Sequence, residues 1–367
     1  MRKRWYRRVL IMIMLLVTVM GTGLSIEELQ KEAKKQQVST GSVSNKMVIP
    51  GGMPIGIYMK TDGVLVLGTD SIEGEDGQEY QPAKNLVKEG DYIVSINTEE
   101  VSSKKELVSK MASLDTNEVV LSLRREEELI DVKIKAVQGK SGDYKLGIWV
   151  RDSVQGLGTL TFVTTDNQFG ALGHGIHDTD TDALIEMEEG RVYETKILRI
   201  EKGEKGSPGG MEGMIVYNRY NILGAIEKNT DIGIFGTLKN AESLTRQEEA
   251  VPVCAKDDVK TGAAVIRCCV EGTVKEYEIE IQKINYFARE TNKGMVIKVV
   301  DEELLEITGG IVQGMSGSPI LQNGKLVGAV THVLVNDPTR GYGIFIENML
   351  EAANTVSKEQ QTKKDAS

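Results

Sequence analysis

The sequence predicts a mostly-β protein in which two folded modules follow an apolar amino-terminal segment. Short apolar runs separated by glycine-containing turns recur through most of the chain, as expected of β-barrels or β-sandwiches. The chain has 367 residues, of which 40% are hydrophobic, so it is long enough for two domains with separate cores. Its formal net charge of −10 argues against nucleic acid as the main partner.

The amino terminus carries the pattern of an export signal or a membrane anchor. An uncharged stretch over residues 9–24 follows five basic residues, Arg2, Lys3, Arg4, Arg7 and Arg8. The stretch is slightly shorter than the roughly 20 residues that cross a bilayer as a helix, although Trp5 and Tyr6 would extend it into the interface. Because no Ala-x-Ala cleavage site follows, we expect residues 1–24 to be a signal anchor that is cleaved slowly or not at all. The rest of the chain, beginning with a polar stalk at 25–50, is then exported.

Residues 51–137 are predicted to form the first folded module. Its expected elements are strands at 55–59 and 64–67, a short helix from 82, a turn and strand at 88–97, a helix at 102–111 and a strand at 119–125. The second helix opens with Ser102 or Ser103 as its cap, and Glu106 is placed for a capping box.

This order of elements resembles a PDZ domain, which binds an extended peptide at the edge of a sheet. The resemblance implies a peptide-binding loop at Ile55, Gly56 and Ile57, a hydrophobic-Gly-hydrophobic sequence. Because the usual Gly-Leu-Gly-Phe sequence is absent, an internal segment of a partner is an alternative ligand to a carboxyl terminus. A β module with a purely structural role is the other interpretation of residues 51–137.

A linker at 139–143 leads to a second module at 145–356. Short apolar strands and glycine turns continue through it, and a charged tail at 357–367 is predicted to be disordered. Near its end, residues 314–320 read Gly-Met-Ser-Gly-Ser-Pro-Ile and precede a hairpin with an Asn-Gly turn at 323–324. Glycines let the backbone approach a substrate carbonyl, so Ser316 is a candidate nucleophile and the amides of Gly314 and Ser316 form a candidate oxyanion hole. A surface turn between two strands is the alternative.

Three blocks of the chain, at residues 170–176, 293–320 and 324–347, resemble the family of stage IV sporulation protein B. This is the sporulation serine peptidase family of the trypsin-like clan. The resemblance covers the arrangement of membrane segment, PDZ module and peptidase, and it implies a trypsin-like double β-barrel with serine endopeptidase activity. Family members of this kind are expected in the space between forespore and mother cell. There they would process themselves in trans and cut a membrane-bound regulator of an intramembrane protease, which triggers activation of a late sigma factor.

A serine nucleophile needs a base, and the chain has only three histidines. With the resemblance, His174 in its Gly-His-Gly setting is the expected base, so that each barrel supplies one catalytic group. His177 is expected in a loop, and His332 is expected to line the specificity pocket. Without the resemblance, a histidine hydrogen-bonded inside a turn is the simpler interpretation of His174.

The resemblance points to Asp301 as the acid that orients the base. Asp231 fits the usual trypsin-like spacing better, because it lies well upstream of Ser316 and in the first barrel. Asp301 could instead cap a short helix at 302–307.

We expect no cofactor and no metal. His174-x-x-His177 is followed by several aspartates but lacks the helical Glu of a zinc protease. Cys254, Cys268 and Cys269 give an odd count, so small buried hydrophobic residues are a simpler interpretation than a Cys254–Cys268 bridge. Two rival functions remain, a non-catalytic PDZ adaptor and a heat-shock-type trypsin-like protease. The latter carries its protease first and its PDZ domain last.

Overall fold

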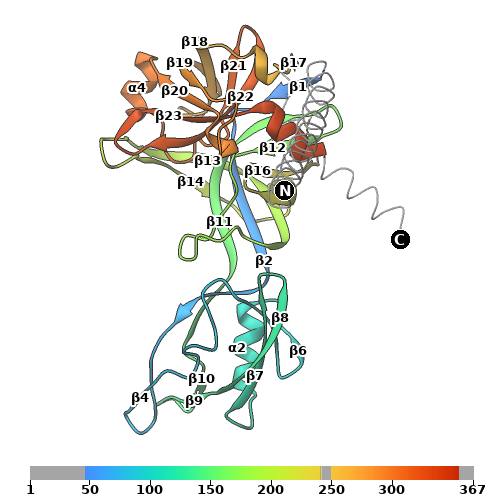
Figure 1. Ribbon diagram of the computed structural model, residues 1–367, viewed down its shortest axis with the longest axis vertical. Helices are drawn as coiled ribbons and strands as arrows, with labels where there is room; N and C mark the ends of the chain where they lie inside the picture. The colour runs from blue at the N-terminus through green and yellow to red at the C-terminus, as the bar shows by residue number, and fades with distance from the viewer. Residues whose placement is uncertain (1–45, 240, 242–248, 355–367) are drawn as a thin grey trace, which may run out of the picture.

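The computed structural model describes residues 46–239, 241 and 249–354 (Figure 1). The predicted signal anchor at 1–24, nearly all of the stalk at 25–50 and the tail at 357–367 lie outside these residues. Within the described part of the chain, no helix has both the length and the apolarity to cross a membrane.

The first barrel is a ring of six strands in which every neighbouring pair is hydrogen-bonded and β2 pairs with β11 to close it. Its core contains Ile55, Ile57, Phe169 and Val192. Three further strands flank the ring: two short ones, and a third that is hydrogen-bonded to one of the ring strands. In ring order the strands are β2 (Pro54–Thr69), β11 (Ile148–Val163), β12 (Gln168–Ala171), β16 (Gly233–Leu238), β15 (Ile222–Thr230) and β13 (Met187–Glu201), flanked by β1 (Met47–Pro50), β17 (Val251–Pro252) and β14 (Gly210–Ile215).

The second barrel is a closed ring of six strands with its own core, which includes Tyr277, Ile297 and Phe345. The predicted hairpin before its last strand is confirmed, because Asn323 and Gly324 have φ of 53° and 73°, as a tight Asn-Gly turn needs. In ring order the strands are β18 (Gly262–Cys268), β19 (Lys275–Ile284), β20 (Met295–Val299), β23 (Asp337–Phe345), β22 (Lys325–Leu334) and β21 (Pro319–Gln322), with α4 (Glu302–Thr308), η1 (Lys256–Asp258) and η2 (Thr291–Lys293) between strands.

A third unit extends from the first barrel. It packs a helix, α2, against the far ends of β2 and β11 and against further strands. Of the two predicted caps the structure selects Ser103, whose hydroxyl accepts from the Glu106 amide, and the Glu106 carboxylate closes a variant of the predicted capping box by accepting from the Ser102 amide, one residue before the cap. The elements are β3 (Ile72–Glu73), β4 (Glu79–Tyr80), β5 (Tyr92–Ile96), β6 (Glu99–Glu100), α2 (Lys104–Ala112), β7 (Glu118–Arg125), β8 (Glu128–Lys135), β9 (Val137–Gln138) and β10 (Tyr144–Lys145).

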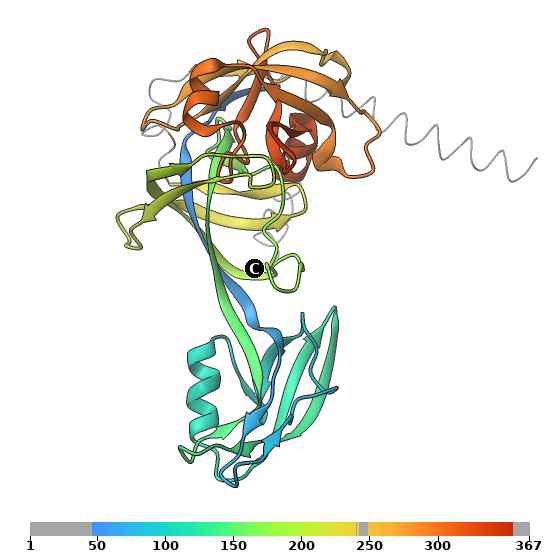
Figure 2. The same ribbon diagram turned by 90° about the vertical axis from the view of Figure 1, so that its left-hand side faces the viewer.

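This unit is inserted into the first barrel; we call residues 61–152 the inserted module. Strands β2 and β11 are 16 residues long each, and they run from the barrel into the module as one antiparallel pair (Figures 1 and 2). The predicted order of a complete module at 51–137 followed by a complete peptidase at 145–356 therefore needs correction. Residues 47–60 belong to the first barrel, because β1 pairs with β11 and the first half of β2 pairs with both β11 and β13.

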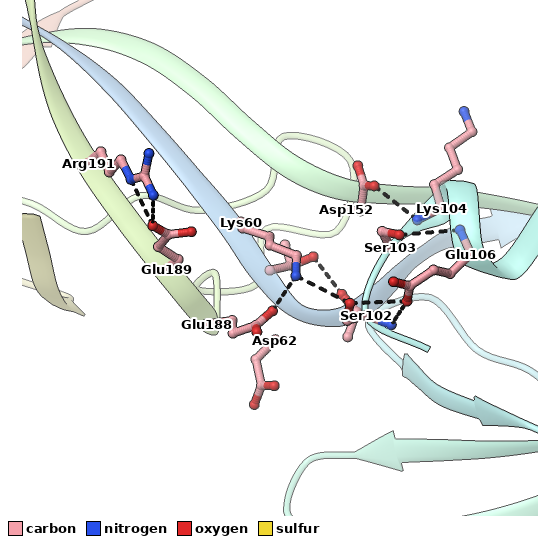
Figure 3. Close-up of polar contacts among 12 residues, drawn as sticks. Lys60, Asp62, Ser102, Ser103, Lys104, Glu106, Asp152, Glu188, Glu189 and Arg191 are labelled. Carbon is pink, nitrogen blue, oxygen red and sulfur yellow. Dashed lines mark hydrogen bonds and ion pairs between the residues drawn. The ribbon is translucent and has the colours of Figure 1, made fainter. Parts of the chain in front are cut away.

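Side chains tie the inserted module to the barrel where the two meet. The Lys60 ammonium group lies 2.6 Å from a Glu188 carboxylate oxygen and donates to the Ser102 hydroxyl at 3.3 Å (Figure 3). Close by, within the inserted module, the Lys104 amide at the start of α2 donates to Asp152 on β11 at 2.9 Å (Figure 3). The junction thus combines the paired strands with charged contacts to the first turn of α2.

Candidate active site

Ser316 lies in a tight loop, residues 313–318, that we call the nucleophile loop. Gly314 and Gly317 have φ of +100° and +94°, where side chains other than glycine are strained. A Cβ at Gly317 would lie 2.1 Å from the Thr159 carbonyl oxygen, so no side chain fits between the loop and the first barrel at this position. The glycines on both sides of Ser316 therefore allow this conformation and this contact.

His174 follows β12 of the first barrel, and its ring is held by its own loop. Its Nδ1 lies 2.7 Å from the Gly175 carbonyl oxygen. A carbonyl oxygen can only accept, so the contact assigns the proton to Nδ1 and leaves the lone pair of Nε2 free. That tautomer is the one a general base needs.

The two barrels bring His174 and His332 together, and Ser316 contacts the residue that precedes His332. His332 lies on β22, and its ring centroid is 5.0 Å from that of His174. The Ser316 hydroxyl donates at 2.7 Å to the carbonyl of Thr331, the residue before His332. A rotation of this hydroxyl away from Thr331 is therefore needed before it can donate to an imidazole.

Burial sets the charge of both histidines. Burial, followed by the proximity of His174, lowers the pKa of His332 to about 4. Burial also lowers the pKa of His174, with the Gly175 carbonyl opposing the shift and His177 adding to it. Both rings are neutral at neutral pH, so His174 is in the form that accepts a proton.

The nucleophile loop also contains two backbone amides without partners. Among the described residues, the amides of Gly314 and Ser316 have no hydrogen-bond acceptor, whereas Met315 and Gly317 donate to Val312 and Val330. Alternate free amides next to a serine hydroxyl are the donors that an oxyanion hole requires.

Asp301 is not where the sequence-based assignment needs it. One of its carboxylate oxygens accepts from the Leu304 amide at 2.9 Å and the other from the Glu278 amide at 3.1 Å. It is the N-cap of α4 and does not contact His174. The structure thus corrects the prediction that Asp301 orients the base, because both oxygens bind backbone amides and the Gly175 carbonyl occupies His174 Nδ1.

Asp231 comes nearer to the histidine loop. Its carbonyl accepts from the Gly175 amide at 3.2 Å, but its side chain is 83% exposed and lies 3.8 Å from Nε2 of His177. Neither candidate acid therefore contacts His174. Asp178, one of the aspartates that follow His177, pairs with Arg151.

A model of the SpoIVB peptidase S55 family matches residues 142–350. The chain belongs to this family. It is therefore a serine endopeptidase, and Ser316, His174 and His332 all lie in the matched segment. A search of curated protein sequences gives no match.

Solved structures resemble separate parts of this peptidase. The PDZ domain of the SdrC-like protein Lin2157 from Listeria innocua is 25% identical over 24% of this chain and 94% of that chain, with a TM-score of 0.21. The active form of the Rv3671c protease from M. tuberculosis is 15% identical over 54% of this chain and 74% of that chain, with a TM-score of 0.31. The HtrA-type protease AlgW with decapeptide is 13% identical over 57% and 55%, with a TM-score of 0.30.

The peptide-binding loop predicted at Ile55, Gly56 and Ile57 is wrong. These residues lie in β2, which pairs with β11 on one side and with β13 on the other. Ile55 and Ile57 are buried in the core of the first barrel. No free sheet edge remains there for an added strand.

The peptidase instead has a groove in the inserted module, between α2 and β10–β11. It encloses about 670 Å³ and is lined by Leu107, Val108, Met111, Ile148 and Trp149, among others. At its end, Leu146-Gly147-Ile148 repeats the hydrophobic-Gly-hydrophobic pattern, with φ of +66° at Gly147. In the sequence this tripeptide follows the module predicted at 51–137 and does not open it. It is the sequence signal that could have located the groove.

Proposed function

We propose that Ser316 is the nucleophile of this serine endopeptidase and His174 its general base. The observation that carries the proposal is the tautomer of His174, because Nδ1–H donates to the Gly175 carbonyl and Nε2 is left as the acceptor. His174 takes the Ser316 proton at Nε2 while Oγ attacks the scissile carbonyl carbon, and the amides of Gly314 and Ser316 bind the oxyanion. His174 then gives this proton to the leaving amine. Water hydrolyses the acyl-enzyme next: His174 takes a proton from water as the water oxygen attacks the acyl carbon, and the proton returns to Ser316 Oγ as the acid product leaves.

Self-cleavage tests this assignment. Ser316→Ala and His174→Ala should each abolish it in the purified full-length chain while leaving the fold intact. Because the two residues act as a unit, the double variant should be no worse than either single one. Amino-terminal processing by purified Ser316→Ala protein alone would reject this nucleophile.

For the biological role, family membership supports a proposal of sporulation signalling. The peptidase would be exported, anchored by residues 1–24 on the forespore side of the intermembrane space, and partly released by cleavage in trans within the stalk. Its protein substrate would be a membrane-bound regulator of an intramembrane protease, whose cleavage triggers activation of a late sigma factor. No nucleic acid takes part.

Co-expression tests the anchor and the cleavage in trans. Tagged Ser316→Ala protein is made beside wild type, and its size and membrane association are followed. Active copies should trim the inactive one and release it from the membrane. An inactive copy that stays full length and membrane-bound beside active enzyme would exclude processing in trans.

The groove between α2 and β11 would select the target. Within the described residues, β11 has no partner strand on the side of Ile148–Val150 that faces α2, so an extended peptide can pair there. The non-catalytic adaptor remains the rival for the chain as a whole. Family membership and the presence of both Ser316 and His174 favour the enzyme.

A further inference from the structure

The nucleophile loop belongs to the second barrel, but a strand of the first barrel holds it. The Thr159 amide of β11 donates to the Ser316 carbonyl at 3.0 Å. The Thr159 hydroxyl donates to the Gly314 carbonyl at 2.8 Å, and the Thr161 hydroxyl donates to the Gly317 carbonyl at 2.8 Å. Three consecutive contacts therefore join β11 to the backbone on both sides of Ser316.

These contacts are protected from water. Thr159 and Thr161 are 1% and 0% exposed. Water cannot reach a buried carbonyl that has lost its hydrogen-bond donor. Removing either hydroxyl would therefore leave a carbonyl unpaired, at a cost in free energy. Valine would fill the same space on a β-strand, and the hydroxyl is what threonine adds.

The held carbonyls fix the peptide planes that alternate with those carrying the two free amides. The Gly314 carbonyl lies in the plane that joins Gly314 to Met315, and the Ser316 carbonyl lies in the plane that joins Ser316 to Gly317. The amides of Gly314 and Ser316, which have no partner, lie in the alternate planes. Because glycine allows many backbone conformations, the sequence of the loop alone does not hold both amides in place.

We propose that Thr159 and Thr161 are positioning residues for the reaction. They hold the nucleophile loop so that the Ser316 hydroxyl and the two free amides are presented together, and they act through the loop without touching substrate. The proposal rests on the assignment of Ser316 as nucleophile. It adds that the geometry of the oxyanion hole depends on the first barrel.

A fluorophosphonate probe tests this in the full-length chain. Ser316 Oγ attacks phosphorus, its proton passes to His174 Nε2 and fluoride leaves, so labelling reports the nucleophile and the oxyanion donors without a known substrate. Labelling over a range of probe concentrations separates the bond-forming rate, kinact, from the probe affinity, KI. Thr159→Val should lower kinact by about 10- to 100-fold, as expected for a misplaced reacting group, with little change in KI.

Two further variants separate positioning from general destabilisation. Thr159→Ser keeps the hydroxyl and should recover most of kinact. Thr195→Val is the matched control, because Thr195 is also buried in the first barrel and its hydroxyl donates to the Met214 carbonyl at 2.9 Å, away from the nucleophile loop. It should lower the thermal unfolding midpoint as Thr159→Val does and leave kinact nearly unchanged. If Thr159→Val does not fold, Thr161→Val takes its place.

Equal kinact for Thr159→Val and Thr195→Val would overturn the proposal, as would a Thr159→Ser variant as slow as the valine variant. Ser316→Ala, measured alongside, shows which idea has failed. Labelling that survives in Ser316→Ala removes the assigned nucleophile. No labelling in Ser316→Ala, together with wild-type kinact in Thr159→Val and in Thr161→Val, removes only the positioning role.

Discussion

The imidazole rings of His174 and His332 lie with their centroids 5.0 Å apart, one from each barrel. Nδ1 of His332 is buried and has no hydrogen-bond partner among the described residues. Burial lowers the pKa of His332 to about 4, and a proton on His174 would oppose one on His332. The pair is thus built to remain neutral at neutral pH.

Stability should depend on pH through His332. The unfolded side chain takes up a proton near pH 6.5 but the folded one only near pH 4, so between these values the unfolded state binds more protons. Stability is therefore lost as pH falls through this window. His174, His177, Lys293 and Glu290 are the charged or titratable groups that act on the ring, and all remain in His332→Phe. Thermal unfolding at pH 6.5 and pH 4 should show a smaller loss in His332→Phe than in wild type; equal losses would contradict the role of His332.

The labelling rate should also report the state of His174. Because its pKa is lowered by burial, the neutral base persists below pH 6.5. The acid limb of the fluorophosphonate rate profile should therefore have its midpoint below pH 6.5. A midpoint above that value would mean that His174 is not the buried neutral base described here.

Asp301 should matter for stability through its capping role. Asp301→Ala removes the acceptor for the Leu304 amide and should cost about 1 kcal/mol of unfolding free energy. Asp301→Asn should cost less than Asp301→Ala, because the asparagine oxygen can still accept from the Leu304 amide and only the bond from the Glu278 amide is lost. Chemical denaturation of the two variants measures the difference. Equal stability of Asp301→Ala and wild type would show that the cap contributes nothing.

Local sequence was sufficient for several parts of the site. The Asn-Gly hairpin, the capping box at Ser103 and the glycines around Ser316 each depend on neighbouring residues, so their geometry could be predicted. The orientation of His174 could not, since its partner is a backbone carbonyl that no residue type reveals.

The long-range features could not be predicted in the same way. The first half of β2 has the alternation of any short strand, and its pairing with β11 joins residues separated by the whole inserted module. For that reason the sequence pattern predicts the peptide loop at Ile55-Gly56-Ile57, whereas the structure has Leu146-Gly147-Ile148 at the groove. The role of Asp301 cannot be predicted from the sequence, because a carboxylate before a short helix has the same sequence pattern whether it is a cap or a catalytic acid.

The groove makes a separate prediction about peptide binding. Val108 lines it and is 58% exposed, whereas Leu129 on β8 is 73% exposed and lies outside it. In a library of fluorescent decapeptides, Val108→Asp should lose binding of the peptides that wild type selects, and Leu129→Asp should keep it. Both variants should label with fluorophosphonate at the wild-type rate. Equal binding by Val108→Asp and wild type would place the peptide site elsewhere.

The most direct test of the central claim is the intact mass of the full-length chain after fluorophosphonate treatment. Wild type, Ser316→Ala and Ser318→Ala are compared, since Ser318 lies two residues away and is fully buried. The assigned chemistry predicts one adduct on wild type and on Ser318→Ala and none on Ser316→Ala. An adduct on Ser316→Ala, or its loss in Ser318→Ala with the fold intact, would contradict Ser316 as the nucleophile.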